Sequence, residues 1–206
     1  FQDSPRGCYP LFMQHHVAIF ASGTGSNAKK IVEHFKHNPY INVSLIVSNR
    51  ADAPVLEMAH ENGIPTVIID RTSFYQSEDI LKIFNNFSIN FVVLAGFSWL
   101  VPTYLVRAFE HRMVNIHPAL LPKYGGKGMY GMRVHEAVKK AGDTETGITI
   151  HFVNEHYDDG DIVFQARCPI SEADTPEDIA QNIHRLEHRH FPEVIEKLLL
   201  GTESAI

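Results

Sequence analysis

Short, uninterrupted apolar runs recur along the first half of the chain, and segments with apolar residues at helical spacing separate them. Apolar runs of this length, bounded by glycine, asparagine or aspartate, predict strands that are buried on both faces. Strands that alternate with amphipathic helices predict a parallel sheet covered by helices on both faces. The predicted strands are residues 17–21, 44–48, 66–70 and 91–95, and the predicted helices lie around 31–35, at 55–62 and at 78–87.

The second half of the chain predicts a further strand of this sheet and then an antiparallel pair around the turn Asp158-Asp159-Gly160. We therefore expect a single α/β domain with a mainly parallel central sheet, a Rossmann-like N-terminal half and an antiparallel pair in the C-terminal part. The predicted elements are a helix from Pro102 to about Phe109, a strand at 113–117, a helix at 134–141, strands at 147–153 and 162–166, and a helix from Asp174 or Thr175 to about Leu200.

Composition and charge limit the class of protein. A net charge of -6 argues against a nucleic-acid surface, and no apolar run is long enough to cross a membrane. Cys8 and Cys168 lie far apart without metal-ligand spacing, so a cytoplasmic location is expected. Residues 1–16 lack periodicity and a signal-peptide core, so we expect a poorly ordered leader before a domain at 17–202.

The segment Met113–His117 carries the first candidate chemistry. Alternation along a strand places Asn115 and His117 on one face, and Pro118 and Pro122 then stop the strand. An amide and an imidazole side by side can donate to a developing oxyanion or move a proton near neutral pH. The alternative for this pair alone is a structural role, as buried polar groups that join two loops.

A glycine-rich loop at 22–28 follows the first predicted strand and opens a helix, an arrangement that suits an anion. One hypothesis is a monophosphate held by Gly25, Ser26 and Asn27. The alternative is an NADP-linked oxidoreductase in which Arg50 meets the 2′-phosphate, because no acidic residue follows the second strand to bind an NAD ribose. A tight turn that binds nothing is the third possibility.

A second alternative function comes from His184-Arg185-Leu186-Glu187-His188, which matches the HxxEH pattern of some zinc hydrolases. Such a site needs a third protein ligand, and the acidic candidates that follow, Glu193 and Glu196, lie in the same predicted helix. Zinc hydrolysis is therefore disfavoured. A binding module without catalysis is also open, although the polar residues at the strand end argue against it.

Five segments in order make the chain resemble the folate-dependent formyltransferases, and within them the branch that acts on glycinamide ribonucleotide in purine synthesis. Together they cover residues 17 to 200. Members that act on tRNA carry an extra C-terminal domain and formyl-folate hydrolases an extra N-terminal one, so a small nucleotide substrate is expected. The segments are FASGTGSN (20–27), VVLAGF (92–97), NIHPALLPKY (115–124), GITIHFV (147–153) and YDDGDIVFQ (157–165).

The resemblance implies an enzyme that uses 10-formyltetrahydrofolate as co-substrate and needs no metal, acting as a monomer or homodimer on small molecules. It further implies roles for individual residues. The catalytic residues would be Asn115, His117 and Asp158; Gly25, Ser26 and Asn27 would hold the 5′-phosphate and Glu187 the ribose; Leu94, Phe97, Trp99, Val153 and Asn154 would bind the folate; His151 and Thr149 would support the catalytic residues.

Two departures from the family pattern bear on the pocket. Ser98-Trp99 stands where better-known members have an arginine after LAGF, and the chain is one residue shorter before Pro102, which changes the lip of the expected folate pocket. The loop 125–131 is longer than usual and is interpreted either as a mobile lid near the substrate or as a plain surface loop. We also expect a cis peptide bond at Leu121-Pro122, from the resemblance.

Overall fold

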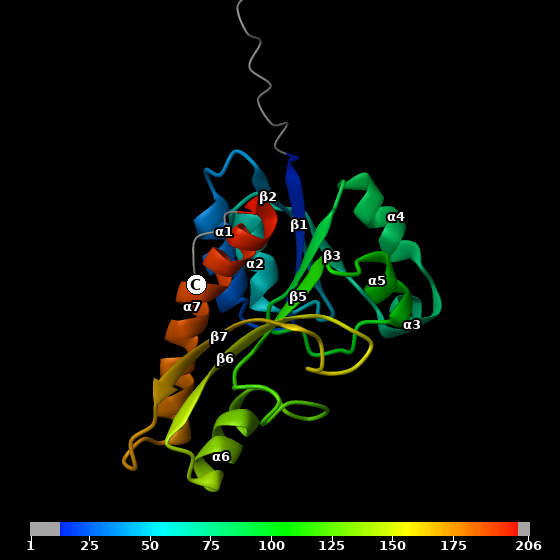
Figure 1. Cartoon of the computed structure of the whole chain (residues 1–206). Helices are drawn as coiled ribbons and strands as arrows, with labels where there is room; N and C mark the ends of the chain where they lie inside the picture. Colours follow the sequence, from blue (N-terminus) through cyan, green and yellow to red (C-terminus); the bar gives the residue numbers. More distant parts are fainter. Residues whose placement is uncertain (1–12, 202–206) are drawn as a thin grey trace, which may run out of the picture.

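Seven strands form one sheet in the order β3-β2-β1-β4-β5-β6-β7 (Figure 1). The computed structural model describes residues 13–201. Strands β1 to β5 are parallel, β6 is antiparallel to β5, and β7 is antiparallel to β6. The strands are β1 (His15–Phe20), β2 (Ile41–Ser48), β3 (Thr66–Ile68), β4 (Phe91–Leu94), β5 (Met113–His117), β6 (Glu145–Phe152) and β7 (Ile162–Pro169).

Helices cover both faces of the sheet. One face packs against α1, α2 and α7, and the opposite face packs against α3, α4 and α5 (Figure 1). Helix α6 lies apart, below the parallel strands, and packs on the segment that follows β5. The helices are α1 (Ser26–Phe35), α2 (Pro54–Glu61), α3 (Arg71–Gln76), α4 (Asp79–Asn86), α5 (Thr103–Ala108), α6 (Met132–Ala141) and α7 (Pro176–Leu200).

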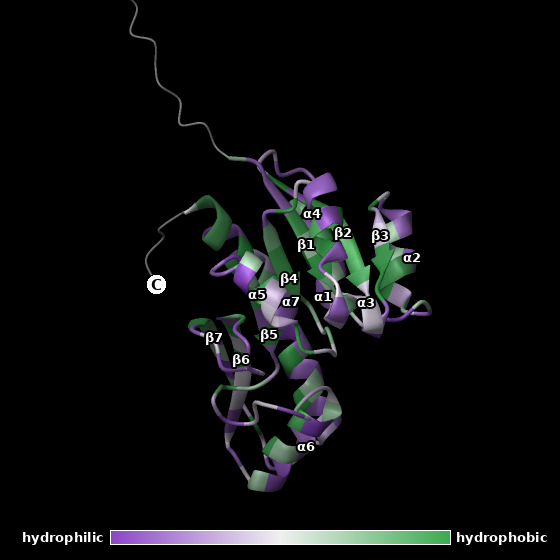
Figure 2. Cartoon of the chain, turned by 90° about the vertical axis from the view of Figure 1, so that its right-hand side faces the viewer, coloured by the Kyte–Doolittle hydropathy of each residue, from purple (hydrophilic) through white to green (hydrophobic). Residues whose placement is uncertain are grey.

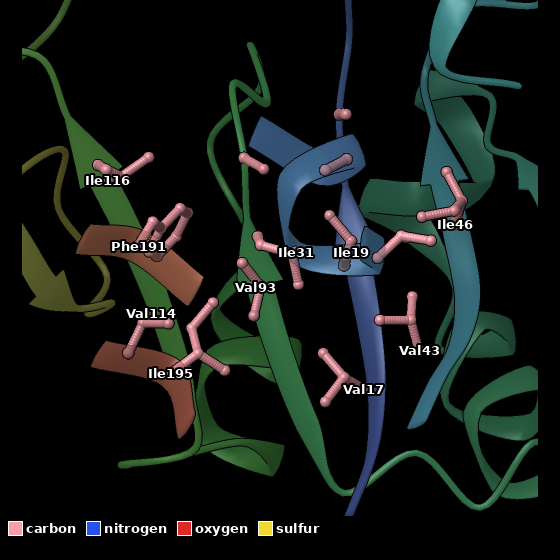
Figure 3. Close-up of a cluster of buried hydrophobic side chains, with 14 of the residues drawn as sticks. Val17, Ile19, Ile31, Val43, Ile46, Val93, Val114, Ile116, Phe191 and Ile195 are labelled. Carbon is pink, nitrogen blue, oxygen red and sulfur yellow. The ribbon is translucent and has the colours of Figure 1, made fainter. Parts of the chain in front are cut away.

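The central strands are apolar throughout because both of their faces are buried. In β1, Val17 and Ile19 face the α1/α7 side, whereas Ala18 and Phe20 face the α3/α4 side, and all four are fully buried. Figure 3 shows the α1/α7 side of this core, where β strands and Phe191 of α7 interlock. Hydropathy coloured on the ribbon follows the same arrangement, with apolar strands inside and polar helix faces outside (Figure 2).

The predicted α/β fold and the antiparallel pair are therefore confirmed. Two strands begin earlier than predicted. β1 begins at His15, so His15 and His16 belong to the sheet rather than to the expected leader, and β2 begins at Ile41 instead of residue 44. The backbone N–H of His15 bonds to the Tyr40 carbonyl, and the His16 ring bonds to Ser44, which extends the pairing with β2. Residues 1–12 of the expected leader lie outside the described residues.

A second difference concerns the third strand. β3 stops at Ile68 instead of continuing to Asp70, and the short helix α3, which the sequence pattern did not predict, begins at Arg71. The reason is local, because the Asp70 carboxylate accepts a hydrogen bond from the Ser73 backbone N–H and caps the new helix. In the described part of the chain no helix has both the length and the apolar character of a membrane span.

Two features of the chain position the candidate site. Helix α7 begins with a capping box, in which Thr175 and Asp178 satisfy each other's backbone N–H groups, and it ends at Gly201 in the left-handed conformation. Strand β5 ends at His117, and the segment after it contains the expected cis peptide bond at Leu121-Pro122.

Candidate active site

A cavity of about 700 Å³ opens where the carboxyl ends of β1, β4 and β5 meet. Open parallel sheets bind ligands at this edge because strand ends and helix starts converge there. Segments far apart in the chain line it: the loop after β1, the segment after β4, the end of β5, the glycine-rich loop before α6, the turn between β6 and β7, and the middle of α7.

His117 lines the cavity and is 3% exposed. Its Nε2 donates to the carbonyl oxygen of Tyr124 at 2.7 Å, and its Nδ1 faces Asp158 Oδ2 at 3.4 Å. Both neighbours are hydrogen-bond acceptors, so only the doubly protonated ring satisfies both contacts. Both ring nitrogens of His117 are therefore engaged with acceptor atoms of the protein.

Asp158 lies in the turn between β6 and β7, where its φ of 53° places the backbone in the left-handed region. Its Oδ2 accepts a hydrogen bond from the Gly126 N–H at 3.0 Å, and its Oδ1 lies 3.7 Å from His151 Nε2. Burial alone would raise the pKa of this carboxyl. The interactions with His117 and His151 outweigh burial and hold the pKa of Asp158 well below its usual range, so the side chain is a carboxylate.

Asn115 joins this group from the same face of β5 as His117, as the alternation predicted. Its amide nitrogen lies 3.1 Å from His151 Nε2 and 3.4 Å from Asp158 Oδ1. His151 Nδ1 lies 2.8 Å from the Phe152 carbonyl, which can only accept, so Nδ1 carries a proton. The structure thus brings together Asn115, His117, Asp158 and His151.

The turn that carries Asp158 depends on a glycine. A Cβ on Gly160 would lie 1.7 Å from the carbonyl oxygen of Phe152, a backbone atom that cannot yield. Phe152 also accepts the bond from the His151 ring, so the tight approach of the turn to β6 sets the distance between His151 and Asp158.

The glycine-rich loop after β1 forms the opposite end of the cavity. Gly25 caps α1 with a φ of 71°, and a Cβ there would lie 2.4 Å from the Val55 side chain, so only glycine fits. Ser26 and Asn27 form the first turn of α1, whose free N–H groups suit an anion.

Glu187 of α7 also lines the cavity and contacts this loop. Its Oε2 accepts a hydrogen bond from Asn27 Nδ2 at 3.0 Å, which ties α7 to the loop across 160 residues of sequence. Glu187 is 6% exposed, and burial raises the pKa of its carboxyl, although Asn27 and the nearby His184 oppose the shift. The four residues expected to hold the nucleotide therefore lie together.

Four of the five residues expected to contact folate line the cavity, namely Leu94, Phe97, Trp99 and Val153. Asn154 does not. Its side chain is used within the turn, where Oδ1 accepts from the His156 N–H and Nδ2 donates to Asp159. The amide of Asn154 is therefore engaged within the turn, and its role in folate binding stays a prediction.

Thr149 also lies outside the cavity, but it supports the segment after β5. It is fully buried, and its Oγ1 donates to the Ala119 carbonyl at 2.7 Å and accepts from the Leu121 N–H at 3.0 Å. These bonds fix the backbone that follows His117.

Ser98 and Trp99, in the segment that follows β4, both line the cavity. Ser98 bonds through its backbone N–H and its hydroxyl to the Ser22 hydroxyl, which links the segment after β4 to the loop after β1. Trp99 packs against Phe97, and the guanidinium of Arg71 lies 5.6 Å from the centre of the Trp99 ring. Phe97 and Trp99 therefore give this part of the cavity an aromatic wall, and Arg71 lies over the Trp99 ring.

The loop 125–131 contributes directly to the site. Gly126 donates to Asp158, as described above, and residues 126–131 line the cavity. The Tyr124 carbonyl that holds His117 lies just before this loop, and the Tyr124 hydroxyl is anchored to Asp143 at 2.8 Å. Of the two interpretations of this loop, proximity to the site is supported, and its mobility stays a prediction.

The alternative functions find no support in the geometry. Arg50 is exposed, pairs with Asp52, and does not line the cavity, so it is not placed to meet a cofactor phosphate there. In the HxxEH segment the His184 and His188 rings stack 6.2 Å apart while Glu187 bonds to Asn27. Among residues 13–201 no three histidine, cysteine or acidic side chains group in a way that could hold a metal ion.

Two histidines that line the cavity, His135 and His184, were not predicted from the sequence as residues of this site. His184 was considered only as a zinc ligand. His135 lies on the buried face of α6 beside Val134 and Val138, so its helical spacing resembles that of any core position. The one signal in the sequence that could have identified His135 was a histidine among the apolar positions of an amphipathic helix.

Along nearly its whole described length the chain is similar to one group of proteins. A family model described as formyl transferase matches residues 15–195. The chloroplastic phosphoribosylglycinamide formyltransferases of Arabidopsis thaliana and Vigna unguiculata are 40% and 41% identical over 87% and 88% of this chain. These matches cover 63% and 60% of the plant proteins, so the chain spans less than two thirds of their length.

Among solved structures, the crystal structure of phosphoribosylglycinamide formyltransferase from Bacillus halodurans is similar in fold. It is 37% identical, with a TM-score of 0.81 over 91% of this chain and 97% of that chain.

Proposed function

Because the chain belongs to the formyl transferase family, we propose that it transfers a formyl group from 10-formyltetrahydrofolate to the amine of 5′-phosphoribosylglycinamide. This reaction is a step of de novo purine (IMP) biosynthesis. The names of the relatives and the resemblance of the sequence motifs support this choice of donor and acceptor.

One observation carries the proposal. Asn115, His117 and Asp158 meet on one wall of a cavity whose other end is the loop Gly25–Asn27. A single bound nucleotide can therefore place its phosphate at the loop and its amine beside the three polar side chains. The aromatic wall around Phe97 and Trp99 offers flat apolar surface for the pterin ring of the folate.

In the proposed reaction the amine nitrogen attacks the formyl carbon and forms the new C–N bond, and the bond from that carbon to N10 of the folate breaks. Negative charge develops on the formyl oxygen between these events. The amide N–H of Asn115 and an N–H of His117 stabilise this oxygen, and each such donor contributes on the order of 10²–10³ in rate.

His117 has both ring nitrogens engaged with protein atoms, so contact with the formyl oxygen requires an exchange of partners. The Tyr124 carbonyl is the partner that the substrate replaces, because it lies next to the loop 125–131, whereas Asp158 is fixed by Gly126. Hydrogen bonds of this kind are commonly realigned when substrate binds.

Asp158 holds the imidazolium of His117 in place by its negative charge. It also accepts the proton that leaves the attacking amine, and that proton then passes to N10 of the leaving folate, directly or through water. The low pKa of the Asp158 carboxyl keeps it ionised at neutral pH, which suits the first of these two roles in particular.

The test is an assay of the purified protein with 10-formyltetrahydrofolate and 5′-phosphoribosylglycinamide, followed by the change in folate absorbance and by mass spectrometry of the product. We expect a formylated nucleotide whose mass is higher by one carbonyl group. One control reaction contains NADPH and tests the oxidoreductase alternative. A second contains a peptide and zinc and tests the zinc-hydrolase alternative. Formylation that is absent while either control turns over would refute the proposal.

Three further expectations belong to this proposal. A monomer or homodimer is predicted, which light scattering after size-exclusion chromatography would determine. Nucleic acid and membrane are not expected as partners. A cytoplasmic location stays a prediction, since the two plant relatives are named chloroplastic.

A further inference from the structure

His135 is a buried titratable residue of the cavity that the mechanism above does not use. It lies in the first half of α6 and is 3% exposed. Its neighbours Val134 and Val138 pack with Ala119 in a small apolar cluster. His135 nevertheless lines the cavity, together with His184 and Glu187 of α7.

The imidazole of His135 is incompletely satisfied. Its Nδ1 is buried and has no hydrogen-bond partner among the described residues. A buried polar atom without a partner costs about 1–3 kcal/mol, and a leucine at this position of the helix would avoid that cost. A bound ligand that supplies the missing partner accounts for a polar residue here.

The imidazole is also uncharged. Burial, together with the nearby rings of His184 and His117, lowers the pKa of His135 to about 4. A neutral imidazole offers no charge to a phosphate. It suits a hydroxyl, which can donate or accept and so matches either tautomer of the ring.

The neighbours of His135 locate it along the cavity. It interacts electrostatically with His117 at the catalytic end and with His184, which precedes Glu187 by less than one helical turn. Glu187 in turn interacts with the same two histidines and bonds to Asn27 of the phosphate loop. His135 and Glu187 therefore border the middle of the cavity, between the two ends.

Resting on the proposed function, we propose that His135 contacts a hydroxyl of the substrate's sugar and, opposite the carboxylate of Glu187, makes the enzyme selective for nucleotides that carry ribose. The middle of the cavity is where the sugar must lie if the phosphate is at Gly25–Asn27 and the amine is at Asn115. The hydroxyl then supplies the partner that Nδ1 lacks.

The experiment measures KM and kcat for the ribonucleotide and for an analogue that lacks both sugar hydroxyls, in the wild type and in His135→Leu. We expect the substitution to raise KM for the ribonucleotide roughly 3- to 10-fold, as loss of one hydrogen bond does, with little change in kcat. KM for the analogue should stay within about 2-fold. Glu136→Leu, on the exposed face of the same helix, is the matched control.

Unfolding in urea separates this role from a structural one. Removal of an unsatisfied buried nitrogen should leave the unfolding midpoint of His135→Leu equal to or above that of the wild type. His135→Asn, which keeps an amide near the position of Nδ1, should recover part of the affinity for the ribonucleotide.

Three outcomes would overturn the inference: an unchanged KM for the ribonucleotide, equal losses for both nucleotides, or a large loss of stability with KM unchanged. Each presupposes that the wild type formylates the ribonucleotide. A wild type that binds neither nucleotide by calorimetry and does not turn over refutes the proposed function instead.

Discussion

At the scale of single residues, the amide of Asn115 is the group whose loss should affect turnover most selectively. Asn115→Ala removes a donor that acts on the developing oxyanion, so kcat should fall about 10²–10³-fold while KM changes little. Steady-state kinetics would check this. Asn154→Ala is the matched control, because Asn154 lies outside the cavity lining, and it should retain near-normal turnover. Comparable losses in both variants would contradict the assignment.

Asp158 links the site to acid stability. Because its folded-state pKa lies below the ordinary value of 3.8, its contribution to folding is fully present above that value and is lost as the pH falls through and below it. The difference in unfolding free energy between the wild type and Asp158→Asn should therefore shrink as the pH is lowered from 5.5 to 3. His117 and His151 face this carboxylate, and both proteins in the comparison contain them. A difference in unfolding free energy that stays constant across this range would show that the Asp158 carboxylate is not stabilised by His117 and His151.

At the scale of elements, the start of α7 determines how firmly Glu187 is held. Thr175→Ala removes the hydroxyl that accepts from the Asp178 N–H and should lower the free energy of unfolding by about 1 kcal/mol. Urea denaturation would measure this change. Thr175→Ser keeps the hydroxyl and should stay close to the wild type. If alanine and serine behave alike, the capping box contributes nothing to stability.

Elements also show how far the sequence determines the fold. Strand β5 has the predicted bounds, because its apolar run is followed by two prolines that stop the ladder. The end of β3 was not predicted, because Asp70 is compatible both with a longer strand and with a helix cap. Its hydrogen bond with the Ser73 N–H favours the cap of α3. The local sequence pattern predicts a helix or strand well where only one secondary structure satisfies the backbone hydrogen bonds.

At the scale of the whole molecule, the candidate site was predictable where the residues form motifs and not where they meet only through folding. The convergence of Asn115 and His117 follows from strand alternation alone. His135 lies in no motif, and its place in the cavity follows from how α6 packs on the segment after β5. The bond between Asn27 and Glu187 joins positions 160 residues apart, a distance over which one sequence carries no pairing signal.

The hydrogen bond between Asn27 and Glu187 leads to the last prediction. It ties the phosphate loop to α7, so nucleotide binding is linked to the stability of the whole domain. A ligand that binds only the folded state stabilises it by about 2.7 kcal/mol at 100 times its Kd, which for a protein of this size raises the Tm by roughly 5–10 °C. We expect 5′-phosphoribosylglycinamide alone to produce such a shift in differential scanning calorimetry. Asn115→Ala should retain the shift, since its amide acts on the formyl oxygen. Asn27→Ala should lose most of it, because Asn27 lies in the first turn of α1 and is hydrogen-bonded to Glu187. A full shift in Asn27→Ala together with none in Asn115→Ala would mean that the nucleotide binds in the reverse orientation.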